Sequence, residues 1–159
     1  MRDIDIIYRI VDKGKIAQFA SQSVLGPRVF NAWYAFDRQT SGIIMTTSKS
    51  TNHVREWEER PLAGGTILGI QPDGVGQRGE AVSFFGNAME VVGVDLERVY
   101  SVYSEKWPRI LTMVPLEAVV NSEGGMRFYE IRVSEWVLYS EFKAGATRVE
   151  VKPETVCQG

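Results

Sequence analysis

Short apolar runs, each bounded by glycine, proline or polar turn residues, recur along most of this chain. In several of them apolar and polar residues alternate, which is the period of a strand with one buried face. Several such strands with a few short helices favour a small barrel with helical flanks. The pattern predicts strands over residues 15–22, 29–36, 42–47, 62–70, 80–92, 126–139 and 146–151.

The first three predicted strands follow one another closely in the chain. Turn residues at 25–27 and 37–41 separate them, so this part is interpreted as a β-meander. Residues 111–120 are less clear, because a short apolar run fits a strand or a helix equally well. Both alternatives stay open for that segment.

Three segments carry the marks of helices. The apolar residues of segment 4–11 recur at helical spacing, and Asp3 and Gly14 provide a cap and an end. Residues 50–60 contain no glycine, are rich in glutamate and arginine, and precede Pro61, so a short helix is predicted there. A third helix is predicted to begin at Asp95 and to end before Pro108, with its apolar residues on one side.

The composition is that of an ordinary globular domain. Of 159 residues, 44% are hydrophobic and 24% are charged, and the formal net charge is −2. No stretch collects the basic residues that would neutralise a nucleic-acid backbone, so nucleic acid is not expected as a partner. We expect one domain over residues 1–152 and a flexible tail over residues 153–159.

The start of the chain and its one cysteine bear on location. Residues 1–5 include acids where a signal peptide has a basic start and an apolar stretch. No apolar run is long enough to span a bilayer. Cys157 has no second cysteine with which to form an internal disulfide. These features predict a cytoplasmic protein without a membrane partner.

One glycine pattern and the single histidine limit the chemistry. Residues 74–79 read G-x-G-x-x-G, but a β-type run follows them, and Asp73 before Gly74 is a hairpin signal. A hairpin loop is therefore favoured over a dinucleotide-binding turn. Because His53 is the only histidine, multi-histidine zinc centres are excluded and no metal site is predicted.

The polar segment 46–53 lies between the end of a predicted strand and the start of a predicted helix. It supplies hydroxyls, an amide, a lysine and an imidazole, and Arg55 adds charge from the first helical turn. Free backbone N–H groups and the positive end of a helix coincide at such a place, which suits a phosphate group. Ordinary helix capping and surface solvation are the alternative interpretation.

The order of several segments resembles the pyridoxamine 5'-phosphate oxidase-like split barrels, in particular a short, poorly characterised bacterial subfamily. The resemblance covers roughly residues 15–140. It is carried by Asn31-Ala32-Trp33-Tyr34-Ala35-Phe36-Asp37, Thr46–His53, Leu62-Ala63-Gly64-Gly65-Thr66, Phe85-Gly86-Asn87-Ala88-Met89-Glu90-Val91, Val102-Tyr103-Ser104-Glu105-Lys106-Trp107-Pro108 and Phe128-Tyr129-Glu130-Ile131-Arg132-Val133.

The resemblance implies a mainly β (α+β) fold, a six-stranded antiparallel split β-barrel, in a homodimer with FMN at the subunit interface. The strand with Trp33 and Tyr34 would face the isoalloxazine ring, and the turn 46–53 would take the ribityl phosphate. Better-studied members place an arginine–lysine pair where this chain has Asn52 and His53. The implied cofactor-binding residues are Arg28, Asn31, Trp33, Tyr34, Thr46, Thr47, Lys49, Thr51, Asn52, His53 and Thr66.

Flavin chemistry needs no side-chain acid or base, so no catalytic residue is predicted. We expect an FMN-dependent oxidoreductase acting on a small molecule, with Tyr103, Trp107 and Arg109 near that substrate. The alternatives are a haem- or deazaflavin-binding split barrel and a flavin-binding or interaction protein without catalysis. His53 is the sole histidine that could serve as an axial haem ligand.

Overall fold

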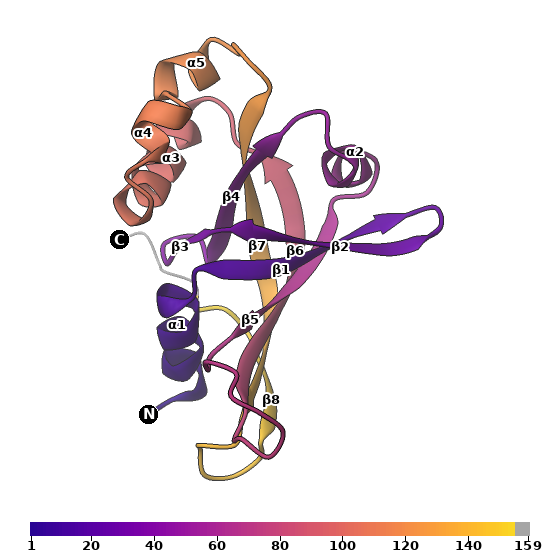
Figure 1. The fold of residues 1–159 in the computed structure, drawn as a ribbon, viewed down its shortest axis with the longest axis vertical. Coiled ribbons are helices and arrows are strands. Elements are labelled where there is room, and N and C mark those ends of the chain that lie inside the picture. The colour runs from indigo at the N-terminus through magenta and orange to yellow at the C-terminus, as the bar shows by residue number, and fades with distance from the viewer. Residues whose placement is uncertain (155–159) are drawn as a thin grey trace.

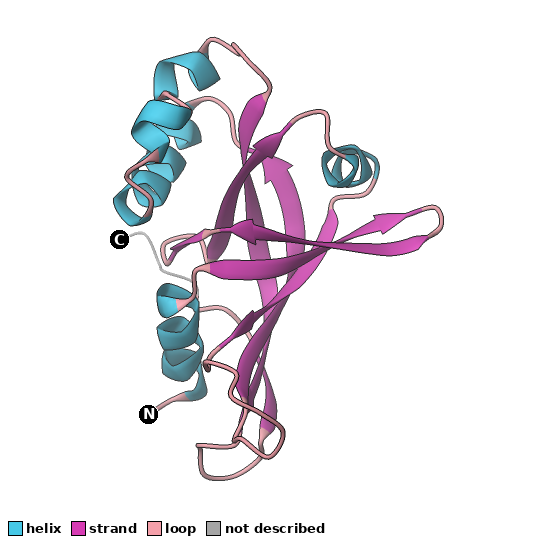
Figure 2. Cartoon of the chain, viewed as in Figure 1, coloured by secondary structure: helices cyan, strands magenta, loops and turns pink. Residues whose placement is uncertain are grey.

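The computed structural model describes residues 1–154, so Cys157 and most of the predicted tail lie outside the described residues. Within them, no helix has both the length and the apolar character needed to cross a membrane. The described chain is a strongly curled sheet with helices packed around it (Figures 1 and 2).

Within residues 1–154, eight antiparallel strands form one sheet in the order β2-β1-β5-β6-β7-β4-β3, and β8 pairs with β7 beside this path. The predicted count of six is therefore wrong, while the mainly β fold is confirmed. The strands are β1 (Ile16–Ser23), β2 (Gly26–Trp33), β3 (Ala35–Asp37), β4 (Gly42–Ser48), β5 (Leu62–Leu68), β6 (Glu80–Glu90), β7 (Met126–Ser140) and β8 (Arg148–Val151).

The predicted strand over 29–36 is divided in two at Tyr34, and the predicted β-meander is wrong. β2 pairs with β1 at one edge of the sheet, whereas β3 pairs with β4, and β4 pairs with β7. The Tyr34 side chain is fully buried, and its hydroxyl donates to the Val11 carbonyl at 2.6 Å. This anchor lies where the chain leaves one edge of the sheet for the other, which local periodicity cannot show.

The first turn is tighter than predicted. Only Val24 and Leu25 separate β1 from β2, and Gly26 with φ of +117° begins β2 together with Pro27. A proline is tolerated there because β2 is an edge strand, and its missing N–H interrupts no inner ladder. At the other hairpin, β5 pairs with β6, so the glycine-rich segment 74–79 is a loop, as predicted.

In the described part of the chain, five helices accompany the sheet. The first begins one residue after its cap Arg2, so Asp3 lies in the first turn and is not the cap. The ambiguous run 111–120 forms two short helices. The helices are α1 (Asp3–Lys13), α2 (Asn52–Glu59), α3 (Val94–Lys106), α4 (Ile110–Met113) and α5 (Leu116–Val120). Figure 1 shows α3, α4 and α5 together at one end of the sheet, with α2 beyond the end of β4 and α1 near the N-terminus.

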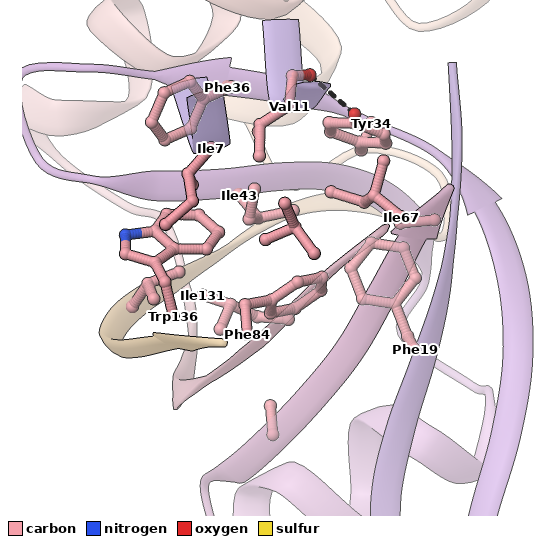
Figure 3. Packing of buried hydrophobic residues seen from close by; sticks show 14 of the residues in the cluster. Ile7, Val11, Phe19, Tyr34, Phe36, Ile43, Ile67, Phe84, Ile131 and Trp136 are labelled. Carbon is pink, nitrogen blue, oxygen red and sulfur yellow. Dashed lines mark hydrogen bonds between the residues drawn. The ribbon is translucent and has the colours of Figure 1, made fainter. Parts of the chain in front are cut away.

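The main hydrophobic core lies inside the curl of the sheet, closed by the apolar face of α1 (Figure 3). Phe19, Phe84 and Trp136 are fully buried there. Gly65 permits this packing, because a Cβ at that position would lie 2.3 Å from Cζ of Phe84. A second cluster joins α3, α4 and α5 to the sheet around Phe128. The space between this helical end and strands β2 and β4 forms the site below.

Candidate functional site

A cavity of about 580 Å³ lies where β2, β4 and the start of β7 meet α3 and α4. Its walls are mostly apolar, and they include Phe30, Met45, Met113 and Met126 in addition to residues named from the sequence. We call it the aromatic cavity, because rings from both sides line it. A largely apolar hollow with a few polar groups is the usual form of a site for a small molecule or a cofactor.

Two tryptophans meet at the mouth of the aromatic cavity. Trp33, 52% exposed, meets Trp107 edge to face, with ring centroids 5.0 Å apart. The indole N–H of Trp107 donates to the Tyr34 carbonyl at 2.8 Å, which fixes its ring. Tyr103 is buried behind them, and burial raises the pKa of its phenol to about 12. Its hydroxyl therefore stays protonated near neutral pH and remains a donor.

A recess of about 520 Å³ lies at the start of α2, and we call it the α2 recess. Thr51 is at the N-cap position, but its hydroxyl donates to the Ser48 carbonyl at 2.9 Å and does not cap the helix. Among residues 1–154, the backbone N–H groups of Asn52, His53 and Val54 have no hydrogen-bond partner. The positive end of α2 is thus left open to a ligand.

His53 lines both the aromatic cavity and the α2 recess. Its ring stacks on Phe30 with centroids 3.8 Å apart and planes inclined by 14°. Its Nε2 lies 3.0 Å from Oγ1 of Thr47 and 3.1 Å from Oγ1 of Thr51. Because the Thr51 hydroxyl already donates to Ser48, its oxygen can only accept from the ring, which favours a proton on Nε2.

The sequence suggested cationic groups from Lys49, His53 and Arg55 at this turn, but the structure places a different cation at the α2 recess. Burial lowers the pKa of the His53 imidazole, which favours the neutral ring in the free protein. Arg28 lines the recess and is paired with Glu56 at 2.7 Å. Arg55 donates to the Ser50 carbonyl at 3.0 Å. Arg28 is therefore the cation that the structure places at the recess.

Most of the residues named from the sequence gather at these two hollows. The α2 recess adds Arg28, Thr51 and Asn52, whereas Lys49 is exposed and lines neither hollow. Thr66 donates to the Val82 carbonyl and lines a different cavity. The aromatic cavity is lined by Asn31, Trp33, Thr46, Thr47, His53, Tyr103, Trp107 and Arg109.

Tyr34, predicted to lie beside a flavin ring, lines neither the aromatic cavity nor the α2 recess. Successive side chains of an extended chain point to opposite faces, and the Tyr34 ring points into the core, where Figure 3 shows its bond to Val11. Trp57 and Trp136 are core residues. Sequence reasoning missed Phe30. Apolar Phe30 next to polar Asn31 follows the alternation of a strand, and this pattern predicts that the two side chains point to opposite faces of the sheet.

No family model matches the sequence, and no curated protein matches it. Within residues 1–154, no group of three or more histidine, cysteine, aspartate or glutamate side chains is placed to hold a metal ion. Solved structures do match. A heme-binding protein from Mycobacterium smegmatis superposes with a TM-score of 0.73 at 13% identity, over 92% of this chain and 57% of that protein. This chain therefore spans little more than half the length of that protein.

Two further matches cover most of both chains. The heme storage protein HutZ from Vibrio cholerae has a TM-score of 0.66 at 17% identity, over 84% of this chain and 91% of that one. A FAD-binding protein from Mesorhizobium loti has a TM-score of 0.65 at 11% identity, over 85% and 90%. At these identities the likeness concerns the fold. The chain is similar in fold to split-barrel proteins that include heme-binding and FAD-binding members.

Proposed function

We propose that this protein binds FMN, with the phosphate in the α2 recess and the isoalloxazine ring in the aromatic cavity. The observation that carries the proposal is the junction of the two hollows at Phe30 and His53. One hollow offers free N–H donors and the other offers apolar and aromatic walls. FMN has the matching polarity, with an anionic phosphate at one end and a flat aromatic ring at the other.

The α2 recess fits a phosphate group. Three backbone N–H groups at residues 52–54 lack partners among the described residues, and the helix dipole adds a partial positive charge. Arg28 lies at the same recess, where a phosphate would compete with Glu56 for its guanidinium. Asn52 and His53 replace the usual basic pair of the resembling family, so we assign phosphate binding to the backbone more than to side-chain charge.

The aromatic cavity fits the ring. Trp33 and Trp107 would border it, and Thr46 and Thr47 offer hydroxyls from β4. When bound, the flavin would supply the hydride chemistry, and the chain would hold and orient it. Arg109 lines the same cavity and would attract an anionic substrate. The activity that follows is oxidation or reduction of a small molecule.

A second copy of the chain is part of this proposal, and the outer face of the sheet supports it. Strand pairing places Val29, Ala20, Gly64 and Phe85 in one row across β2, β1, β5 and β6. Val29 is 78% exposed and Phe85 is 49% exposed. Trp33 lies on the same face, two residues along β2 from Asn31 and four from Val29. Exposed apolar side chains gathered on one sheet face are typical of an interface.

The first test is the absorption spectrum of freshly purified protein, followed by titration with FMN and with riboflavin, which lacks the phosphate. At a hundred times its Kd, FMN should stabilise the fold by roughly 2.7 kcal/mol. Riboflavin should bind at least tenfold more weakly. Equal affinities would contradict the phosphate placement, and a colourless protein without a thermal shift would contradict flavin binding.

Catalysis and the dimer need separate measurements. Flavin-loaded protein should be reduced by NADH or NADPH. If bound flavin is never reduced by either donor, a binding role without this catalysis is favoured. Light scattering should show a dimer that Val29→Glu together with Phe85→Glu converts to a folded monomer. A wild-type monomer would contradict the proposed second copy.

Haem is the second candidate, and one observation favours it. The His53 ring borders the aromatic cavity, and its Nδ1 has no hydrogen-bond partner among the described residues. A proton on Nε2 leaves Nδ1 as the nitrogen able to bind iron. Haem would show an intense Soret band that His53→Ala abolishes, whereas bound FMN would survive that substitution. Mass analysis of the released ligand separates haem, FMN and a deazaflavin.

A further inference from the structure

A second cavity lies apart from the α2 recess, between the C-terminal half of α1, the strands β1, β2 and β5, and the segment 69–72. Its volume is about 550 Å³. Ile10, Ile16 and Leu68 supply apolar walls, and cations and amides supply the polar ones. We call it the α1 cavity. A hollow of this size accommodates a small organic molecule.

A row of uncharged polar side chains crosses the floor of the α1 cavity. Gln18 pairs directly with Asn31 on β2 and with Thr66 on β5, so the three side chains stand on one face of the sheet. Among residues 1–154, the amides of Gln18 and Asn31 make no side-chain hydrogen bond within the protein. Each amide is thus free to donate and to accept.

The charge of the α1 cavity is positive. Arg9, Lys13 and Lys15 line it, and no aspartate or glutamate is among its lining residues. Arg9 is paired with Glu80 at 2.9 Å. Lys13 and Lys15 form no ion pair within the described residues. Two uncompensated ammonium groups therefore border a hollow whose other polar groups are neutral.

The end of α1 would normally oppose an anion, because free carbonyls at a helix C-terminus carry partial negative charge. Here several of these carbonyls are already satisfied. The carbonyl of Ile10 accepts from the Gly14 N–H, and that of Val11 accepts from the Tyr34 hydroxyl. The Gly14 carbonyl accepts from the Lys106 ammonium. The carbonyls of Asp12 and Lys13 have no partner among residues 1–154, so the lysine side chains would attract an anion against a reduced negative charge at the helix end.

We propose that the α1 cavity binds a small organic anion that carries a carboxylate or a phosphate on an apolar body. Lys13 and Lys15 meet the acid group, Gln18 and Asn31 hydrogen-bond its polar substituents, and the aliphatic walls cover the rest. Asn31 also lines the aromatic cavity, so this ligand and a ligand of that cavity would both contact one side chain. Gln18, Asn31 and Thr66 stand on the same outer face of the sheet as Val29 and Ala20, so in the proposed dimer this anion would lie beside the second copy.

The test uses benzoate and phenyl phosphate as anionic probes and benzamide as the uncharged counterpart of benzoate. Calorimetric titration of the flavin-free full chain at low salt should show binding of at least one anion. Benzamide should bind at least tenfold more weakly than benzoate. Lys13→Gln combined with Lys15→Gln should weaken the anion at least tenfold, because both ammonium groups are lost.

A matched control removes two cations elsewhere. Arg148→Gln combined with Lys152→Gln lowers the net charge equally on β8 and beyond, and anion affinity should stay within twofold of wild type. Binding of no anion, or equal loss in both double variants, overturns the proposal. Asn52→Pro distinguishes the two hollows, because it changes only the α2 recess. If this variant loses anion binding while the Lys13/Lys15 double variant keeps it, the anion binds in the α2 recess and the proposal for the α1 cavity is refuted.

Discussion

Polar groups near the start of β4 are hydrogen-bonded or ion-paired within the chain, whereas backbone donors beyond its end have no partner among the described residues. Near its start, Asp37 of β3 and Glu130 of β7 are buried and share the guanidinium of Arg98, and Thr40 donates to Glu130 at 2.5 Å. Beyond its last residue, the start of α2 leaves its N–H groups without partners. Groups satisfied within the chain hold the fold together. Groups left open at a recess mark a place for a ligand.

The largest expected effect is at the satisfied end. Arg98→Met should lower the free energy of unfolding by about 3 kcal/mol, because Asp37 and Glu130 would lose their shared buried partner. Urea denaturation measures this loss. Arg132→Met removes a half-exposed partner of the same Glu130 and should cost less than about 1 kcal/mol. Similar losses of unfolding free energy in both variants would show that the buried ion pairs contribute no more to stability than the half-exposed one.

A smaller loss of unfolding free energy is expected when a side chain is added next to the same buried network. A Cβ at Gly42 would lie 2.2 Å from Oε1 of Glu130, which Thr40 and Arg98 hold in place. Gly42→Ala should therefore cost about 2 kcal/mol in unfolding free energy. Gly125→Ala is the control, since its Cβ would meet only the Ser48 hydroxyl, at 3.3 Å. If Gly42→Ala is as stable as wild type, Glu130 moves freely and the network is loose.

Substitutions at the start of α2 should change ligand affinity more than the free energy of unfolding. Asn52 is the first residue of α2, where proline fits the backbone and removes one free N–H. Asn52→Pro should weaken FMN about tenfold, which corresponds to about 1.4 kcal/mol, with little change in unfolding free energy. Asn52→Ala removes the side chain but keeps the N–H, and FMN affinity should be nearly unchanged. Equal weakening in the two variants would assign the effect to the amide side chain.

The smallest effect concerns the pH dependence of stability. Burial lowers the pKa of folded His53 below its unfolded value of 6.5. As pH falls through 6.5, the unfolded chain gains a proton that the folded chain resists, so His53 contributes a loss of stability on the acid side. His53→Gln should reduce the drop in urea midpoint between pH 7.5 and pH 5. An unchanged drop would mean that other groups account for it.

Local pattern predicted much of the secondary structure. Alternation located β1, β4, β6 and β7, and the change from strand to helix around 46–53 placed a polar turn before α2. The division at Tyr34 was not predicted because residues 29–36 form a largely apolar run with no glycine or proline to mark a break. The full lining of the aromatic cavity could not be predicted from the sequence, because Phe30 and Met113 come from segments far apart in the chain. Their meeting depends on how α4 packs, which no local period encodes.

The amino-acid sequence by itself determined which segments are strands or helices and where hydroxyls, amides and cations are concentrated, because these follow from side-chain chemistry and short-range period. Tertiary structure alone decided that β2 and β3 lie at opposite edges of the sheet and that Tyr34 faces the core. It also decided which donors at the start of α2 stay free and that burial lowers the pKa of His53. Burial and pairing are properties of neighbours in space, and those neighbours come from distant parts of the chain.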